Sequence, residues 1–194
     1  MMKHTGTVPF ETERLICRRF EAGDWHDMLE NWASLPEIQT EYGEPVYTDE
    51  AQVRGLLDSY IKGYERADFY RWAVIERSSG RNIGQIAFCK VWEDCRTAEV
   101  EYCIGTEFWG KGYAGEALAG LVAHSFRTMD FDKLEAYHRA ANVKSGRVLE
   151  KSAMHKTDTV QRFVHEGVDP ACEGEICYCI EKDNYLNIIN ERSC

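Results

Sequence analysis

Three glycines lie at the centre of the stretch with the clearest chemical potential, Phe108 to Leu118. Gly110, Gly112 and Gly115 leave backbone N–H groups uncovered where a strand-like run is followed by an amphipathic helix pattern. Several N–H donors and the positive end of a helix dipole converge at such a place, which favours the binding of phosphate. The stretch therefore predicts a phosphate-bearing ligand, and the sequence context must decide which one.

Two nucleotide-binding patterns match the glycines only in part. Gly110-x-Gly112-x-x-Gly115 has the spacing of the dinucleotide fingerprint, but an antiparallel meander is predicted before it instead of a parallel α/β unit. Gly105 with Gly110-Lys111 is close to the P-loop, yet Gly112 occupies the position of the magnesium-binding Ser or Thr. Neither NAD nor ATP is therefore the predicted ligand.

Candidate proton-transfer groups lie on both sides of the glycines. Glu99 and Glu101 share one face of the preceding strand with Cys103, because strand residues alternate, and they are either a catalytic base or solvated side chains. His138 ends the next predicted strand, where an imidazole can transfer protons at neutral pH, although a lone histidine is also a common packing residue. No histidine is placed with Cys103 by the sequence, so we interpret Cys103 as a packing residue.

Hydrophobic periodicity predicts the elements that must position these residues. We expect a strand over 12–20, a helix over 25–33 capped by Asp24, a loop over 38–47, a helix capped by Thr48 or Asp49, strands over 72–76, 83–92 and 97–104, a helix after the glycines, a strand over 134–139, a short helix capped by Asn142, and strands over 157–164 and 176–180. Short turns make the middle three strands an antiparallel meander, and the helical crossover makes the strand over 134–139 parallel to the third.

Composition bounds the class of protein. The chain has 194 residues, 44% of them hydrophobic and 29% charged, with a net charge of −10, which predicts an ordinary globular domain. Phosphate repels an acidic surface, so we expect no nucleic-acid partner, whereas a cationic substrate such as an amine is compatible with the charge. No apolar run approaches the length of a membrane span, and the start lacks the apolar core of a signal peptide. We therefore expect no membrane association and a cytoplasmic location.

Without an export signal, the cysteines are expected to be reduced thiols, several of them packed as small apolar residues. They are Cys17, Cys89, Cys95, Cys103, Cys172, Cys177, Cys179 and Cys194. No Cys-x-x-Cys pair occurs, and Cys177-x-Cys179 places both thiols on one face of a strand. We therefore expect no metal site.

Four segments, taken in order, carry a resemblance to a known family. They are Glu11–Leu15 with Arg18, Ala98–Tyr102, Phe108–Ala114 with Glu116-Ala117, and Asn142–Lys151. Together they resemble the GNAT acetyltransferases, most closely the branch that contains the ribosomal-protein N-terminal (alanine and serine) acetyltransferases, over roughly residues 11 to 182. The resemblance implies the α+β acyl-CoA N-acyltransferase fold, with a central mixed, mostly antiparallel sheet flanked by helices and splayed at the coenzyme site, in a single domain over residues 1–194.

The resemblance also implies how acetyl-CoA binds. The glycines take the pyrophosphate, the backbone of Cys103 and Ile104 pairs with pantetheine, and Asn142 both caps its helix and bonds a pantetheine amide. Ser145 is similar to a serine that faces the coenzyme sulfur in this branch, although it could also be a surface serine beside a capping asparagine. The implied coenzyme-binding residues are Cys103, Ile104, Trp109, Gly110, Lys111, Gly112, Tyr113, Ala114, Gly115, Asn142 and Ser145.

The implied reaction is direct attack of a primary amine on the acetyl thioester in a ternary complex. Glu99 falls closest to the family's carboxylate base, and Ser145 and His138 are the further catalytic candidates. Leu149 stands where many relatives place a tyrosine general acid. The acceptor is a protein N-terminus or a small amine; the alternatives are a detoxifying acetyltransferase for an aminoglycoside or polyamine, and a weakly active acetyl-CoA-binding module. The sequence is compatible with a monomer or a homodimer.

Overall fold

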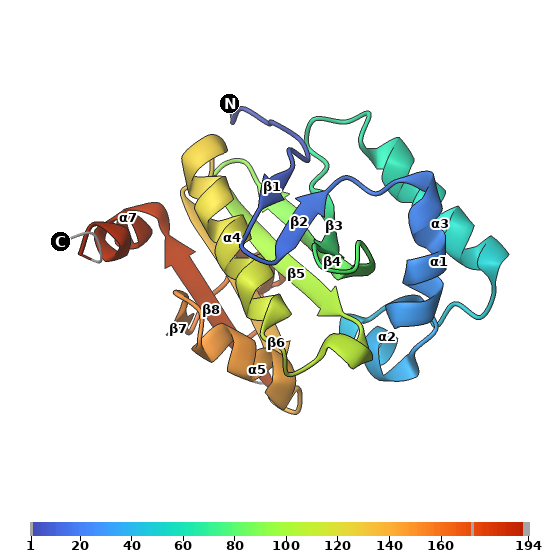
Figure 1. The fold of residues 1–194 in the computed structure, drawn as a ribbon. Helices are drawn as coiled ribbons and strands as arrows, with labels where there is room; N and C mark the ends of the chain where they lie inside the picture. Colours follow the sequence, from blue (N-terminus) through green and yellow to red (C-terminus); the bar gives the residue numbers. More distant parts are fainter. Residues whose placement is uncertain (1, 172, 192–194) are drawn as a thin grey trace. The chain divides into compact units, whose positions relative to one another are not determined.

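The computed structural model describes residues 2–171 and 173–191 (Figure 1). The strands are β1 Phe10–Glu11, β2 Leu15–Arg18, β3 Arg71–Glu76, β4 Asn82–Trp92, β5 Thr97–Ile104, β6 Lys133–Arg139, β7 His155–Thr157 and β8 Glu175–Glu181. The helices are η1 Ala22–Asp24, α1 Trp25–Met28, η2 Leu29–Ala33, α2 Pro36–Tyr42, α3 Glu50–Gly63, η3 Thr106–Phe108, α4 Tyr113–Thr128, α5 Val143–Glu150, α6 Gln161–Glu166 and α7 Lys182–Glu191. None of the described helices is both long and apolar enough to span a bilayer.

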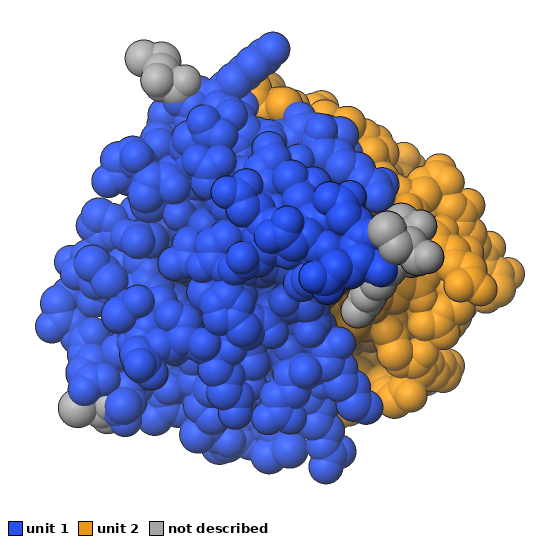
Figure 2. All heavy atoms as spheres, turned by 90° about the vertical axis from the view of Figure 1, so that its left-hand side faces the viewer, with its two compact units in different colours: residues 1–3, 89–100, 122–194 blue, residues 4–88, 101–121 orange. Residues whose placement is uncertain are grey.

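The residues gather into two compact units, which Figure 2 shows in different colours. Unit 1 comprises residues 1–3, 89–100 and 122–194, and unit 2 comprises residues 4–88 and 101–121. The chain crosses between them within β4, β5 and α4, so neither unit is a continuous segment. The strands are ordered β1-β2-β3-β4-β5-β6-β8-β7. This mixed sheet with flanking helices confirms the predicted α+β fold class.

In unit 2, β1, β2, β3 and β4 pair with their neighbours in antiparallel fashion. The β3–β4 hairpin closes through a turn in which the Gly80 N–H donates to the Glu76 carbonyl. The helix before this hairpin was predicted correctly: Asp49 caps α3 by accepting a hydrogen bond from the Gln52 N–H at 2.9 Å. Buried residues of the helices and strands form one apolar cluster, which includes Phe20, Met28, Trp32, Val53, Leu57, Tyr60, Ile75 and Cys103.

Three predictions for the first half of the chain are wrong in detail. The loop over 38–47 begins as α2, because Pro36 occupies the first turn of the helix, where proline is tolerated, and Gly43 ends it with a φ of 75°. The strand over 12–20 is β2 alone, preceded by the two-residue β1. Asp24 lies at the end of η1 and accepts from Arg18 and the Glu21 N–H, so its side chain does not cap α1.

In unit 1, β5 and β6 pair in parallel at Thr97–Glu99, as the crossover predicted, and β6 pairs with β8 in antiparallel fashion along its whole length. The splay of the sheet expected at the coenzyme site stays a prediction. β7 is an edge strand of three residues that pairs with β8. Six cysteines of the described residues are free thiols, as predicted; Cys172 and Cys194 lie outside these residues.

The strand predicted over 157–164 is wrong. Only its first residue belongs to β7, and residues 161–166 form α6. Thr157, Thr159, Val160 and Val164 have the β-branched side chains that favour strands, but packing overrides this preference. Phe163 and Val160 are buried in a small cluster with Cys177, and Tyr137 packs against it. The C-terminal α7 was not predicted. None of its described residues is buried, so it contributes no apolar face to the core.

Gly84 provides a test of how closely β4 approaches β5 within unit 2. A Cβ atom at Gly84 would lie 2.2 Å from the carbonyl oxygen of Cys103, and a backbone atom cannot move away cheaply. We expect Gly84→Ala to lower the free energy of unfolding by about 2 kcal/mol or more, as overpacking does. The measurement is urea denaturation followed by circular dichroism.

The control is Gly55→Ala in α3, where a new Cβ would meet nothing within 4 Å. Alanine is the better helix former, so this variant should gain up to about 1 kcal/mol. If Gly84→Ala were as stable as the control, the close approach of β4 to Cys103 would be refuted.

Candidate functional site

The glycine stretch leads from η3 into α4, within unit 2. Gly110 and Gly112 have φ values of 76° and 84°, a conformation that side chains disfavour, so glycine is required at both positions. A Cβ added at Gly110 or Gly115 would meet nothing within 4 Å, and at Gly112 only the Arg14 Nη2, 3.5 Å away. The glycines therefore leave the backbone of this loop open. They do not serve to let another part of the protein pack closely against it.

The start of α4 supplies the hydrogen-bond donors. The first N–H groups of a helix, here those of Tyr113, Ala114 and Gly115, have no acceptor within the helix. The intrahelical ladder begins with the Glu116 N–H, which donates to the Gly112 carbonyl at 3.0 Å. A pyrophosphate fits this place, because the space is open, the first N–H groups of the helix have no acceptor within it, and the positive end of a 16-residue helix dipole lies there.

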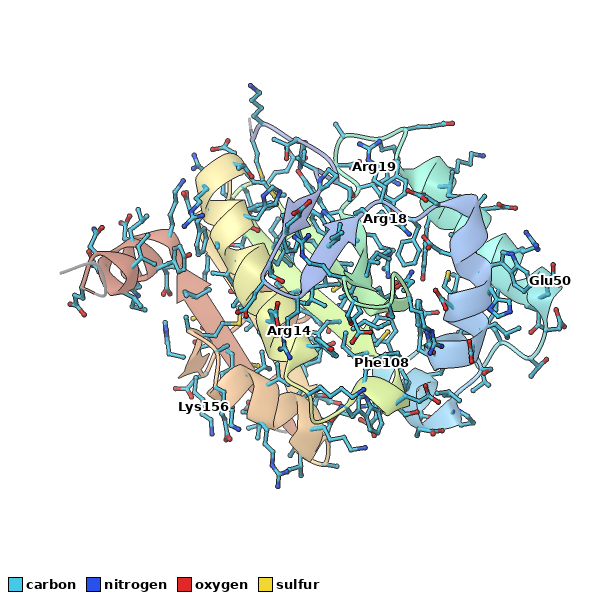
Figure 3. All side chains as sticks on the ribbon, in the orientation of Figure 1. Arg14, Arg18, Arg19, Glu50, Phe108 and Lys156 are labelled. Carbon is cyan, nitrogen blue, oxygen red and sulfur yellow. The ribbon has the colours of Figure 1, made fainter. Side chains whose placement is uncertain are left out.

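A cluster of four residues, Thr12, Arg14, Lys111 and Glu116, fixes this loop, and we call it the Glu116 cluster. The Glu116 carboxylate accepts from the Thr12 hydroxyl at 2.6 Å, the Arg14 N–H at 2.8 Å and the Arg14 Nε at 2.6 Å. Arg14 Nη1 also donates to the Lys111 carbonyl at 2.9 Å, and Figure 3 shows Arg14 beside the first turns of α4. The segment Glu11–Leu15 thus holds the loop from a position about a hundred residues earlier in the chain.

Charge and burial are balanced in the Glu116 cluster. Burial alone would raise the pKa of Glu116, but hydrogen bonds from Thr12 and Arg14 outweigh it and hold that pKa below its usual value. The same contact raises the pKa of Arg14, whose guanidinium also lies over the Tyr113 ring at 4.6 Å. The Tyr113 hydroxyl donates to the Glu76 carboxylate. Tyr113 is therefore tied to β3 as well as to the loop.

The backbone expected to pair with pantetheine lies at the end of β5. The Trp109 indole Nε1 donates to the Ile104 carbonyl at 2.7 Å, which leaves one lone pair on that oxygen. The side chain of Cys103 is buried in the apolar cluster of unit 2, and burial raises the pKa of its thiol to about 12. This supports the interpretation of Cys103 as a packing residue, because a thiol is a weak nucleophile.

Asn142 and Ser145 lie at the start of α5, in unit 1. The Asn142 Oδ1 accepts a hydrogen bond from the Ser145 N–H at 3.1 Å, which confirms the predicted cap. This bond uses one of the two lone pairs of Oδ1, so the other lone pair and the side-chain Nδ2 remain for a coenzyme amide. Ser145 is half-buried, one position before the buried Gly146, and Leu149 is 1% exposed. Leu149 is thus a core residue of α5, and its side chain supplies no acid.

His138 lies under α5. Its Nδ1 is 2.8 Å from the Arg139 carbonyl oxygen, and since a carbonyl only accepts, Nδ1 carries the proton. The Nε2 is buried and has no hydrogen-bond partner among the described residues. A Cβ at Gly146 would lie 2.8 Å from the imidazole Cε1, so Gly146 lets α5 approach the ring. The sequence contains no sign of this second role of glycine.

Glu99 is not a solvated side chain. It is 4% exposed, and Arg162 donates to both of its carboxylate oxygens, from Nε at 2.8 Å and from Nη2 at 2.6 Å. The Cys89 thiol donates to the same carboxylate at 2.9 Å. A role as base would therefore require Arg162 to release an oxygen. Arg162 lies in α6, an element that was not predicted, so sequence reasoning missed this partner.

Glu101, in the part of β5 that belongs to unit 2, has a different partner. Arg71 Nη2 donates to its carboxylate at 2.6 Å, while Nη1 donates to Gln85 at 2.7 Å and the guanidinium lies over the Tyr60 ring at 4.5 Å. Burial alone would lower the pKa of Arg71, but Tyr42, Tyr60 and Glu101 outweigh it and raise that pKa. Glu101 is therefore a second half-buried carboxylate with an arginine partner. The sequence predicted only the face of the strand on which Glu101 lies.

Comparison with known proteins agrees with this geometry. The family model of the acetyltransferase (GNAT) domain matches residues 14–155. The uncharacterized N-acetyltransferase p20 of Bacillus licheniformis is 26% identical over 152 residues, which cover 78% of this chain and 85% of the relative. The uncharacterized N-acetyltransferase YoaA of Bacillus subtilis is 24% identical over 160 residues, which cover 82% of this chain and 90% of the relative.

Solved structures share the fold. The acetyltransferase (GNAT family) from Bacillus anthracis has a TM-score of 0.72 at 24% identity, covering 91% of this chain and 99% of that one. The ribosomal-protein-S5-alanine acetyltransferase from Vibrio fischeri has a TM-score of 0.70 at 16% identity, covering 91% and 97%. The matched residues include the glycines, the Asn142 cap and all of the Glu116 cluster except Thr12. The chain belongs to the GNAT family of acetyltransferases.

Proposed function

We propose that this acetyltransferase uses acetyl-CoA and transfers the acetyl group to a primary amine, within a single domain formed by the whole chain. The observation that carries the proposal is the glycine loop, whose open backbone at the start of α4 is fixed by the Glu116 cluster. Acetyl-CoA, when bound, supplies a thioester whose acetyl carbon accepts the amine nitrogen. The family is defined by this cosubstrate, and the loop suits its pyrophosphate.

Different residues of the chain bind the coenzyme and assist the transfer. The N–H groups of Tyr113, Ala114 and Gly115 bind the pyrophosphate, and the backbone at Ile104 orients the pantetheine arm. A base removes a proton from the ammonium form of the acceptor, which predominates at neutral pH because amine pKa values lie at about 8 to 10. The C–N bond then forms as the C–S bond breaks, the nitrogen loses its second proton, and the departing thiolate, which accepts a hydrogen bond from the Ser145 hydroxyl, takes up a proton to leave as coenzyme A.

The acceptor is a protein N-terminus or a small amine. The net charge of −10 favours a cationic acceptor of either kind. One neighbour in fold is named a ribosomal-protein-S5-alanine acetyltransferase, which makes peptide N-termini the first class to test. Glu99, Glu101 and His138 are the candidate bases, and a glutamate can serve only if its arginine partner releases a carboxylate oxygen.

The proposal predicts selective binding of acetyl-CoA. Calorimetric titration of the full chain should give micromolar affinity for acetyl-CoA and no binding of NAD or of ATP with magnesium. Binding should be followed by acetylation of peptide N-termini or polyamines in a mass-spectrometric screen. A preference for NAD or ATP would refute the assignment of the loop, and binding without turnover on any amine would favour a binding module.

Replacement of Gly112 tests the loop itself. Gly112→Val forces a β-branched residue into the left-handed region, which costs about 1–2 kcal/mol, and turns the N–H donors away. We expect acetyl-CoA affinity to fall at least tenfold while the chain stays folded, as judged by calorimetry and circular dichroism. The matched control is Gly167→Val at the end of α6, which has a φ of 67° and nothing within 4 Å. Equal affinities of the two variants would contradict the proposal.

Replacement of Ser145 tests the hydroxyl. Ser145→Ala keeps the cap, because Asn142 accepts from the backbone N–H, and should lower kcat roughly ten- to a thousandfold with little change in acetyl-CoA affinity. Ser59→Ala, an exposed helix serine in α3, serves as the control and should leave kcat unchanged. A parallel loss of affinity and kcat would make Ser145 a binding residue.

A further inference from the structure

The register of the sheet edge brings together three residues that no catalytic role uses. His155 of β7 lies directly opposite Cys179 of β8, and Glu181 follows two residues later on β8. Opposed residues of an antiparallel pair share a face, and so do residues two apart on one strand. His155, Cys179 and Glu181 therefore project from the same face of unit 1, and we call them the edge cluster.

The distances within the edge cluster are those of ligands around one ion. Cys179 Sγ lies 3.3 Å from His155 Nε2 and 3.6 Å from Glu181 Oε1, and His155 Nε2 lies 3.8 Å from Glu181 Oε2. Sulfur, nitrogen and oxygen ligands at their usual bond lengths from a tetrahedral zinc ion are separated from one another by about 3.4–3.6 Å. The three donor atoms could bind a zinc ion after small side-chain rotations.

The nearby charges favour a cation. Lys133, opposite Glu181 on β6, has its Nζ 2.6 Å from Glu135, so its charge is already compensated. Glu181 accepts one further hydrogen bond, from Asn184 at 2.9 Å.

Lys156, the neighbour of His155, does not compete for these ligands. Adjacent strand residues point to opposite faces, and the Lys156 Nζ lies over the Tyr178 ring at 5.9 Å and 3.7 Å from Glu150. Figure 3 labels Lys156 at β7. The side chains of His155 and Glu181 are 53% and 40% exposed, so an ion could enter from solvent and keep a water as its fourth ligand.

We propose that His155, Cys179 and Glu181 bind a zinc ion that joins the edge strand β7 to β8. A thiolate, an imidazole and a carboxylate form a donor set for a borderline-soft divalent ion, whereas magnesium and calcium need several oxygen ligands. A three-residue edge strand gains little from its own hydrogen bonds, so a metal crosslink between residues 155 and 179 adds to its stability. The site is structural and independent of acetyl transfer.

A second group in the described residues serves as a comparison. His26, Asp27 and Glu30 also place three donor atoms within 4.8 Å of one another. Asp27 accepts from the Asn82 N–H, and both Asp27 and Glu30 pair with Arg81 at 3.5 and 3.0 Å. Arg81 therefore already compensates both carboxylates, and the group contains no sulfur ligand. We therefore assign zinc to the edge cluster and not to this helix.

The experiment uses the full chain, stripped with a chelator, reduced and titrated with Co²⁺ and then Zn²⁺. Co²⁺ should bind at one equivalent with a thiolate-to-cobalt charge-transfer absorption that Zn²⁺ removes, and Zn²⁺ should raise the melting temperature. His155→Gln and Glu181→Gln, both at exposed positions, should each weaken binding by at least tenfold, a loss that even indirect partners of a metal can cause. Cys179→Ser should abolish the thiolate absorption.

The controls are Cys177→Ser, two residues away on the same strand, and His26→Gln in the comparison group; both should retain the absorption and the affinity. The proposal is overturned if no ion binds at micromolar concentration, if binding lacks the thiolate absorption, or if either glutamine variant keeps wild-type affinity. Loss of the absorption in Cys177→Ser would also overturn it. Because His155 and Glu181 are surface residues, these outcomes remain decisive even if the buried Cys179→Ser fails to fold.

Discussion

The geometry of the glycine loop depends on one carboxylate, that of Glu116. It accepts three hydrogen bonds from the segment that contains Thr12 and Arg14. Arg14 in turn donates a hydrogen bond to the Lys111 carbonyl and so fixes the loop. Two neighbouring glycines with positive φ would otherwise give the loop many conformations. Because the pKa of Glu116 is lowered in the folded chain, this stabilisation is complete at neutral pH and is lost only as the pH falls through that lowered value.

The elements around the loop could be predicted because each has a strong local signal. The strands over 72–104 alternate between short turns, and α4 has an apolar stripe after its glycines. Asp49 and Asn142 both accept from the N–H three residues later, which the cap patterns predicted. The failures lie where local signals conflict with packing. Residues 38–47 were predicted to be a loop although α2 extends to Tyr42, and the β-branched run before Phe163 became partly helical.

The partners of the candidate residues could not be predicted for a different reason. Glu99 and Arg162 are 63 residues apart, and Thr12 and Glu116 are 104 apart, so no spacing rule connects them. Periodicity places a carboxylate on a strand face, but it does not identify the cation that lies opposite. The same limit applies to the proposed zinc site: ligand spacing along the chain predicted no metal site, whereas the proposed ligands His155 and Cys179 meet through strand register across 24 residues.

One row of residues across the sheet of unit 1 relates these observations. The register places Glu99 beside Glu135, Glu135 beside Cys179, and Cys179 beside His155, all on one face. Both carboxylates in this row are buried, and burial of a charge is tolerated only when an opposite charge joins it. Arg162 joins Glu99, and Lys133 joins Glu135. Cys179 and Glu181 continue this face toward the edge, with Glu181 opposite Lys133 in the register, and the proposed zinc ion would add a second positive charge beside them.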